Sequence, residues 1–301
     1  MTGFAADWLS LREPADRRAR DPAILQAVAA RFARSGRVCV TDLACGTGSS
    51  LRALAAHLPA QQTWRLVDHD PLLVAAAARA ASNGAYPPGI ELETLQADLA
   101  LELEAVVALD ADLLTTSAFL DLVSDDWLSR MVAAAAAHRR PVYAALSYDG
   151  RVACSPPDPL DSVVLEAFDI HQRRDKGLGG PAGADRTDGL GGALGPTAAA
   201  IAAQRFAARG FSVLTARADW DLTPAESALQ DRLLLGWHAA VAETGRVAPD
   251  DLDRWLARRR AALAEGRSRL RVGHVDLFAV PPGDALSPAR STSHSRSAPS
   301  A

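Results

Sequence analysis

The chain has 301 residues, of which 49% are hydrophobic and 23% charged, a balance typical of a globular protein with a sizeable core. Its net charge of −4 creates no overall positive field, which disfavours nucleic acids and anionic membranes as partners. Three cysteines without metal-ligand spacing, and no apolar run of signal-peptide or membrane-span length, disfavour a disulfide framework, a metal site and export, so we expect a cytoplasmic protein.

The first predicted elements are a helix, a strand, a glycine turn and a second helix. Apolar residues recur at helical spacing over Pro22–Arg34, and residues 1–35 are expected to form an N-terminal helical cap. Val38–Leu43 has the composition of a short buried strand. Cys45–Gly48 is rich in glycine, and helical spacing returns over Ser49–Leu58.

Strands and helices continue to alternate as far as residue 146. The predicted strands are Trp64–Val67, Ile90–Leu95, Asp112–Ser117 and Val142–Leu146, and the predicted helices are Pro71–Ala81 and Asp125–His138. Alternation of this kind favours right-handed crossovers and a parallel sheet covered by helices on both faces. The pattern therefore predicts a doubly wound α/β fold.

The pattern changes between residues 155 and 196. A helix at Leu160–Gln172 leads into two similar glycine-rich runs, Lys176–Gly180 and Asp188–Gly192. A long segment of this composition inside a domain is typical of a lid or an insert.

The last part of the chain resumes the alternation and then loses its apolar residues. The predicted elements are a helix at Thr197–Arg209, a strand at Phe211–Ala218, helices at Ala225–Glu243 and Asp250–Glu265, and a strand at Leu270–Val280. Residues 282–301 are rich in Ser, Pro and Arg, and we expect them to be disordered. Residues 36–281 are thus expected to form one domain, with insertions at 155–196 and 220–268.

The glycine turn and the end of the next strand indicate an adenosine-ribose site. Gly46 and Gly48 let the backbone pass close to a ligand at the start of a helix, where free amides face it. Asp68 ends the second strand, where a carboxylate can accept both ribose hydroxyls. Dinucleotide enzymes share this spacing, so an NAD(P)-binding oxidoreductase remains an alternative. Against it, Leu51 stands where a dinucleotide fingerprint needs its third glycine, and Asp42 would repel a pyrophosphate but attract a cationic amino group.

The run from Asp42 to Gly48 resembles motif I of class I S-adenosylmethionine (SAM)-dependent methyltransferases, with Ala44 where glycine is commoner. The resemblance implies a seven-stranded, mostly parallel sheet with an antiparallel last strand. It also implies that the motif lies beside the methionine part of SAM, that Asp68 binds the ribose and that Asp98 reaches the adenine. The implied cofactor-binding residues are Asp42, Ala44, Cys45, Gly46, Thr47, Gly48, Asp68, His69, Ala97, Asp98, Leu99, Thr116 and Ser117.

No catalytic residue stands out, but four side chains are candidates. Asp121 and Tyr148 follow predicted strands, where acceptor-side residues project, although either could cap the next segment. His171 lies near the end of a predicted helix, and Lys176 begins the first glycine-rich run. The two side chains could form a clamp for the substrate, or they could belong to a solvated helix end. His274 lies inside the last strand, and we expect it to be structural.

These observations together predict methyl transfer from SAM by in-line attack on the sulfonium methyl. The acidic balance and the insertions favour a small-molecule acceptor. A SAM-binding regulator without catalysis is a third possibility. The sequence does not indicate the acceptor atom, the pathway or the oligomeric state.

Overall fold

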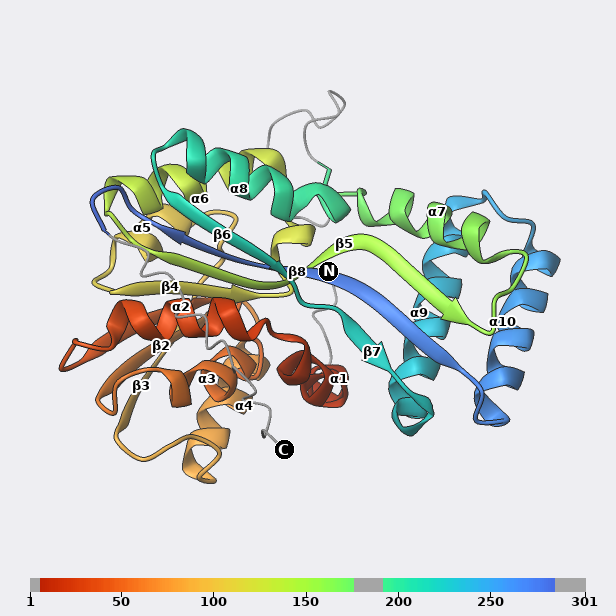
Figure 1. Cartoon of the computed structure of the whole chain (residues 1–301), viewed down its shortest axis with the longest axis horizontal. Helices are drawn as coiled ribbons and strands as arrows, with labels where there is room; N and C mark the ends of the chain where they lie inside the picture. The colour runs from red at the N-terminus through yellow and green to blue at the C-terminus, as the bar shows by residue number, and fades with distance from the viewer. Residues whose placement is uncertain (1–5, 176–191, 285–301) are drawn as a thin grey trace, which may run out of the picture.

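The computed structural model describes residues 6–175 and 192–284 as a central sheet flanked by helices (Figure 1). The runs Lys176–Gly180 and Asp188–Gly191, and residues 285–301 of the predicted tail, lie outside the described residues. The strands are β1 (Val38–Leu43), β2 (Gln62–Asp68), β3 (Ile90–Gln96), β4 (Leu113–Ser117), β5 (Val142–Ser155), β6 (Ser212–Arg217), β7 (Trp220–Leu222) and β8 (Arg269–Val280). The helices are α1 (Ala6–Ala19), α2 (Pro22–Phe32), α3 (Ser49–Leu54), α4 (Pro71–Ser82), α5 (Leu103–Ala108), α6 (Asp125–Ala137), α7 (Asp161–Gln172), α8 (Ala198–Ala208), α9 (Ser227–Thr244) and α10 (Pro249–Ala264).

The sheet has the order β3-β2-β1-β4-β5-β8-β6, and β7 pairs with β8 outside this path. Strands β1 to β5 run parallel to one another, whereas β8 is antiparallel to both β5 and β6. The doubly wound class and the antiparallel last strand are therefore confirmed. Within the described residues the sheet has eight strands instead of the expected seven. The additional strand is the short β7, which pairs with the first residues of β8.

Two helical layers bury the two faces of the sheet. Helices α2, α3 and α4 cover one face, where Leu51 and Trp64 are fully buried. Helices α5, α6 and α8 cover the other face around Trp127 and Phe206. Local sequence sets where two of these helices begin, since Asp21 caps α2 and Ser124 caps α6 through hydrogen bonds to backbone amides.

The far ends of β5 and β8 leave the sheet and carry a second packing unit, seen on the right of Figure 1. We call it the lobe; it consists of β7, α7, α9, α10 and the paired segments 152–155 and 269–272 of β5 and β8. Its core includes the buried Trp237 and Trp255. Strand β5 was expected to end at Leu146 but continues to Ser155, so the lobe and the sheet share two strands.

Candidate functional site

A glycine turn joins β1 to α3 and is tied to the end of β2. Gly46 and Gly48 have φ angles of +54° and +84°, which only glycine adopts without strain. The amide of Gly46 donates to Oδ2 of Asp68 at 2.9 Å, and the amide of Asp70 donates to Oδ1 of the same carboxylate at 3.0 Å. Asp68 thus orients the turn. Each of its carboxylate oxygens can accept a further hydrogen bond.

Asp42 is a buried carboxylate without a hydrogen bond. Its side chain is fully buried at the end of β1, and neither oxygen has a partner within hydrogen-bond geometry. Burial raises the pKa of Asp42 to about 7, and the nearby Ser50 hydroxyl and Arg20 guanidinium only partly oppose this rise. A group of this kind is suited to pairing with a cation that arrives in the site.

The expected adenine side and the end of β4 lie on neighbouring strands. Gln96 pairs with Asp68 in register, and Asp98, two residues further, is exposed and accepts a hydrogen bond from the amide of Ala100. Ala97 and Leu99, on either side of Asp98, are buried. His69 lies with Nδ1 3.3 Å from Asp68.

Two of the predicted residues end β4, next to β1. Thr116 is buried, and its hydroxyl has no hydrogen-bond partner. Ser117 accepts a hydrogen bond from Arg20 at 3.1 Å. Because Asp42 pairs with Thr115 across the two strands, Thr116 and Ser117 follow directly beside Asp42.

Helix α1 lies over the glycine turn. Leu9 Cδ1 is 3.1 Å from the position that a Cβ on Gly46 would take, and the Tyr86 hydroxyl is 2.5 Å from the corresponding position on Gly48. Glu13 fixes the helix there by binding Arg52 at 2.7 Å, and Arg52 also donates to the Thr47 carbonyl at 2.7 Å. The side chains of Leu9 and Tyr86 therefore pack against the turn.

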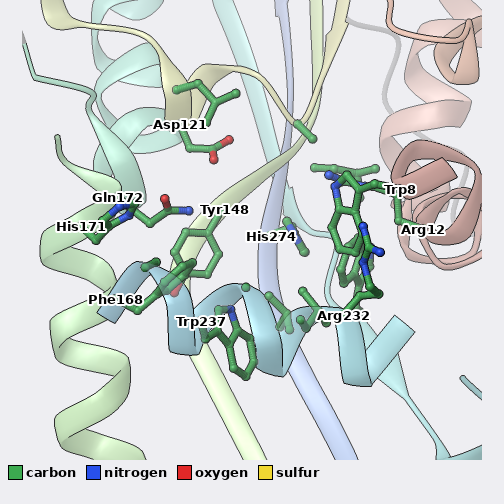
Figure 2. A pocket seen from close by; sticks show the side chains of 18 residues that line it. Trp8, Arg12, Asp121, Tyr148, Phe168, His171, Gln172, Arg232, Trp237 and His274 are labelled. Carbon is green, nitrogen blue, oxygen red and sulfur yellow. The ribbon is translucent and has the colours of Figure 1, made fainter. Parts of the chain in front are cut away.

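A pocket of about 420 Å³ opens beside the end of β4 and the middle of β5, between the sheet and the lobe. Three of the four catalytic candidates line it: Asp121, Tyr148 and His171 (Figure 2). The fourth, Lys176, lies outside the described residues. Three side chains from distant segments, which the sequence did not indicate, complete much of the wall: Phe168, Trp220 and Trp237.

The polar candidates in the pocket are held by acidic partners. The Tyr148 hydroxyl donates to Asp169 at 2.8 Å, and burial together with Asp169 raises the pKa of Tyr148 far above its ordinary value. Tyr148 is therefore a neutral phenol and not a base at neutral pH. His171 Nε2 lies 3.1 Å from Glu243 on α9, which links α7 to the opposite wall.

Helix α1 contributes Arg12 to the pocket wall, and the carboxylate of Asp16 neutralises its charge. Arg12 forms two hydrogen bonds with Asp16, at 2.9 and 3.1 Å, and its guanidinium stacks over Trp220 with 4.9 Å to the ring centroid. The Trp220 indole donates to Asp16 at 3.0 Å. These contacts bind α1 to β7 and hold the N-terminal segment at the pocket. On this helix Leu9 contacts the glycine turn, whereas the adjacent Trp8 lines the pocket.

His274 occupies the centre of the pocket wall, between Tyr148 and the pair formed by Trp8 and Arg12 (Figure 2). It pairs with Tyr148 across β5 and β8, and its ring lies 4.9 Å from that of Trp220. The expectation of a purely structural histidine rested on its place inside a strand. The structure instead puts this buried side chain at the pocket, a position that the alternation of β8 alone does not reveal.

No protein-family model and no curated protein matches the sequence. Solved structures with a similar course of the chain include a SAM-dependent methyltransferase from Thiobacillus denitrificans in complex with S-adenosyl-L-homocysteine, at 17% identity over 90% of this chain and 97% of that one, with a TM-score of 0.43. The cyclopropane synthase MmaA2 from Mycobacterium tuberculosis is 12% identical over 85% and 83% of the two chains, with a TM-score of 0.42. The [4+2]-cyclase SpnF is 16% identical over 86% and 80%, with a TM-score of 0.39. Similarity at this level carries no information about the reaction.

No helix within residues 6–175 and 192–284 combines the length and the apolar character that crossing a membrane requires.

Proposed function

We propose that this protein is a SAM-dependent methyltransferase that acts on a small molecule bound in the pocket between the sheet and the lobe. The observation that carries the proposal is that two carboxylates lie together at the glycine turn. Asp68 accepts a hydrogen bond from the Gly46 amide, and the oxygens of the buried Asp42 beside it have no partner within hydrogen-bond geometry among the described residues. The doubly wound fold places this turn at the carboxyl ends of the strands, where such sheets bind cofactors.

The residues at the turn suit the chemistry of SAM. Asp42 would pair with the α-amino group of the methionine part, because an unpartnered buried carboxylate gains most from a cation. Asp68 and Asp98 would accept hydrogen bonds from the ribose and the adenine, with His69, Ala97 and Leu99 beside them. Thr116 and Ser117 would lie under the transferred methyl group, and Ala44, Cys45, Thr47 and Gly48 would supply backbone contacts.

Helix α1 contacts both the proposed cofactor site and the proposed acceptor site. Leu9 of α1 covers Gly46, and Trp8 and Arg12 of the same helix line the pocket. When bound, SAM supplies a methyl group already activated on sulfur. The chain then has to orient the acceptor and exclude water, which a pocket walled by aromatic side chains does.

Titration calorimetry with SAM, S-adenosylhomocysteine, NADH and NADPH tests the proposal. We expect the first two to bind and the nicotinamide cofactors not to bind. Binding of NADH or NADPH without SAM would replace the proposal with an oxidoreductase. Binding of SAM without methyl transfer to any member of a broad panel of hydroxyl, amine and thiol compounds would favour a regulator. The variant Asp110→Asn serves as a control, since that side chain is 97% exposed and far from the turn in sequence.

A further inference from the structure

Five of the residues that line the pocket are Trp, Tyr or Phe. Trp8, Tyr148, Phe168, Trp220 and Trp237 contribute indole, phenol and phenyl groups to a space of about 420 Å³. Rings of this kind bind planar π systems by stacking and edge-to-face contacts, at low cost in side-chain entropy. A volume of a few hundred Å³ fits a ligand of one to three fused rings.

The polar groups on two sides of this space are already engaged. The Tyr148 hydroxyl is committed to Asp169, and Arg12 and the Trp220 indole are both committed to Asp16. These side chains therefore offer a ligand their ring faces more than their polar atoms.

His274 differs from these neighbours. Its side chain is 5% exposed, and its Nδ1 atom has no partner within hydrogen-bond geometry. Because Nδ1 is enclosed, Nε2 is the ring nitrogen that a ligand in the pocket can approach. A neutral imidazole has one lone pair, and the tautomer with the proton on Nδ1 places this lone pair on Nε2.

Burial keeps His274 neutral. Burial and, to a smaller extent, the charge of Arg12 on α1 lower the pKa of His274 to about 4, and Asp16 and Asp219 oppose this shift only in part. The lone pair of a neutral imidazole accepts a hydrogen bond from a donor such as a hydroxyl group.

We propose that the pocket binds a planar aromatic compound carrying a hydroxyl group, that this hydroxyl donates a hydrogen bond to Nε2 of His274, and that its oxygen is the methyl acceptor. The last part rests on the proposed methyltransferase function, whereas the binding part does not. In the reaction, the hydroxyl oxygen forms a bond to the methyl carbon while the carbon–sulfur bond breaks and its electron pair remains on sulfur. The hydroxyl proton passes to Nε2 of His274 and then to solvent. A methylated, still protonated hydroxyl is far more acidic than an imidazolium, so even a weakly basic histidine accepts this proton.

Three probes separate the two features of the proposed ligand without SAM. These probes are 2-naphthol, 2-methoxynaphthalene, which has the rings but no donor, and decahydro-2-naphthol, which has the donor but no aromatic ring. Quenching of tryptophan fluorescence and calorimetry report binding to the wild-type protein. We expect 2-naphthol to bind about tenfold more tightly than either other probe, the ratio for one buried hydrogen bond or one stacking contact. Equal affinity for naphthol and its methyl ether would overturn the role of the hydroxyl, and equal affinity for the saturated alcohol would overturn the aromatic class.

Variants then assign the hydrogen bond to His274. In His274→Phe, which keeps a ring, the preference for naphthol over its methyl ether should fall to about one, and in His274→Gln, which keeps an acceptor, part of it should return. His238→Phe is the matched control, because His238 pairs with Asp253 on the lobe surface at 2.7 Å and does not line the pocket. A full preference in His274→Phe would refute the assignment. Should that variant fail to fold, the three-probe comparison on the wild type still decides the ligand class. Naphthol binding in a protein that does not bind SAM would keep the pocket assignment and end the proposed reaction.

Discussion

The Oδ2 atom of Asp68 accepts a hydrogen bond from the amide of Gly46 at 2.9 Å, so the end of β2 sets the shape of the turn that follows β1. The same carboxylate is the proposed ribose ligand. One side chain thus links the stability of the turn to cofactor binding, and its two roles can be separated by substitution.

Asp68→Ala should abolish SAM binding and lower the melting temperature, because it removes both the ribose ligand and the support of Gly46. Asp68→Asn keeps a hydrogen-bond acceptor, so it should preserve most of the stability while weakening SAM binding about 10- to 100-fold, as expected for the loss of a charged hydrogen bond. Calorimetry and thermal denaturation measure the two effects. Equal SAM affinity in wild type and Asp68→Asn would show that the negative charge at this position does not contribute.

Asp42→Asn should stabilise the protein at alkaline pH. The carboxyl has a pKa of about 7 in the folded state and 3.8 as its ordinary value, so the folded state holds an extra proton between these values. Its contribution to stability is complete below about pH 4 and is lost as the pH rises through 7, a difference of about 4 kcal/mol at most. Denaturant unfolding at pH 5 and pH 8 should show a pH-dependent loss in the wild type that is smaller in the variant. The same variant should bind SAM weakly. A wild-type stability that rises from pH 5 to pH 8, with no difference from the variant, would contradict the assignment.

Glu13→Gln should accelerate SAM association. The Glu13 carboxylate holds Arg52 and thereby keeps α1 over the turn, where Leu9 contacts Gly46. A neutral side chain weakens this half-buried ion pair by about 1 kcal/mol, which releases the helix more often. Stopped-flow fluorescence measures the rate. The control is Glu91→Gln, which removes an exposed ion pair with Arg37 on the other edge of the sheet and should leave the rate unchanged. An unchanged rate in Glu13→Gln would indicate that α1 does not limit access.

His171→Ala should reduce turnover and spare SAM affinity, since His171 lines the pocket and not the glycine turn. We expect a loss of about tenfold or more in kcat/KM, the range for a positioning or proton-transfer group. Lys176→Ala is expected to behave in the same way. Steady-state kinetics and SAM titration distinguish the effects, and an unaltered kcat/KM in both variants would remove the proposed clamp.

Gly273→Ala should destabilise the fold by about 2 kcal/mol or more. A Cβ at this position of β8 would overlap Asp149 and come within 2.7 Å of Arg151 Cβ, in a region tied together by the Arg151–Asp219 ion pair. Gly236→Ala is the matched control on α9, where a Cβ meets nothing within 4 Å, and it should be neutral or stabilising by up to about 1 kcal/mol. Urea unfolding of both variants provides the comparison. A neutral Gly273→Ala would contradict the close packing there.

Most of the sheet and the glycine turn were predictable because their signals are local. The order of strands and helices, the turn at Gly46 and the carboxylate at Asp68 all depend on short runs of sequence. Two elements were missed for lack of a local signal: α5 is six residues long, and β7 is three. The predicted end of β5 at Leu146 was also wrong, because the strand passes Asp149–Gly150, a dipeptide typical of turns, through an irregularity in its pairing with β8.

The pocket was only partly predictable, since its walls come from segments that are distant in sequence. Asp121, Tyr148 and His171 were indicated by their places after strands and helices. Trp8 and Arg12 lie in the expected N-terminal cap but were not among the catalytic candidates, because α1 carries Pro14 and many charged residues and shows no strong apolar stripe. Their role depends on the docking of α1 against β7, a tertiary contact without a local signature.

The two strands that continue from the sheet into the lobe also restrict which segments of this protein can be deleted or exchanged. Since β5 and β8 carry hydrogen-bonded residues in both places, deleting 220–268 would leave the far halves of these two strands without β7 and without the covering helices α9 and α10. Acceptor specificity therefore cannot be transplanted by exchanging the lobe as a module. Chimeras that keep both strands from one parent, and vary only the side chains that face the pocket, are the ones we expect to fold.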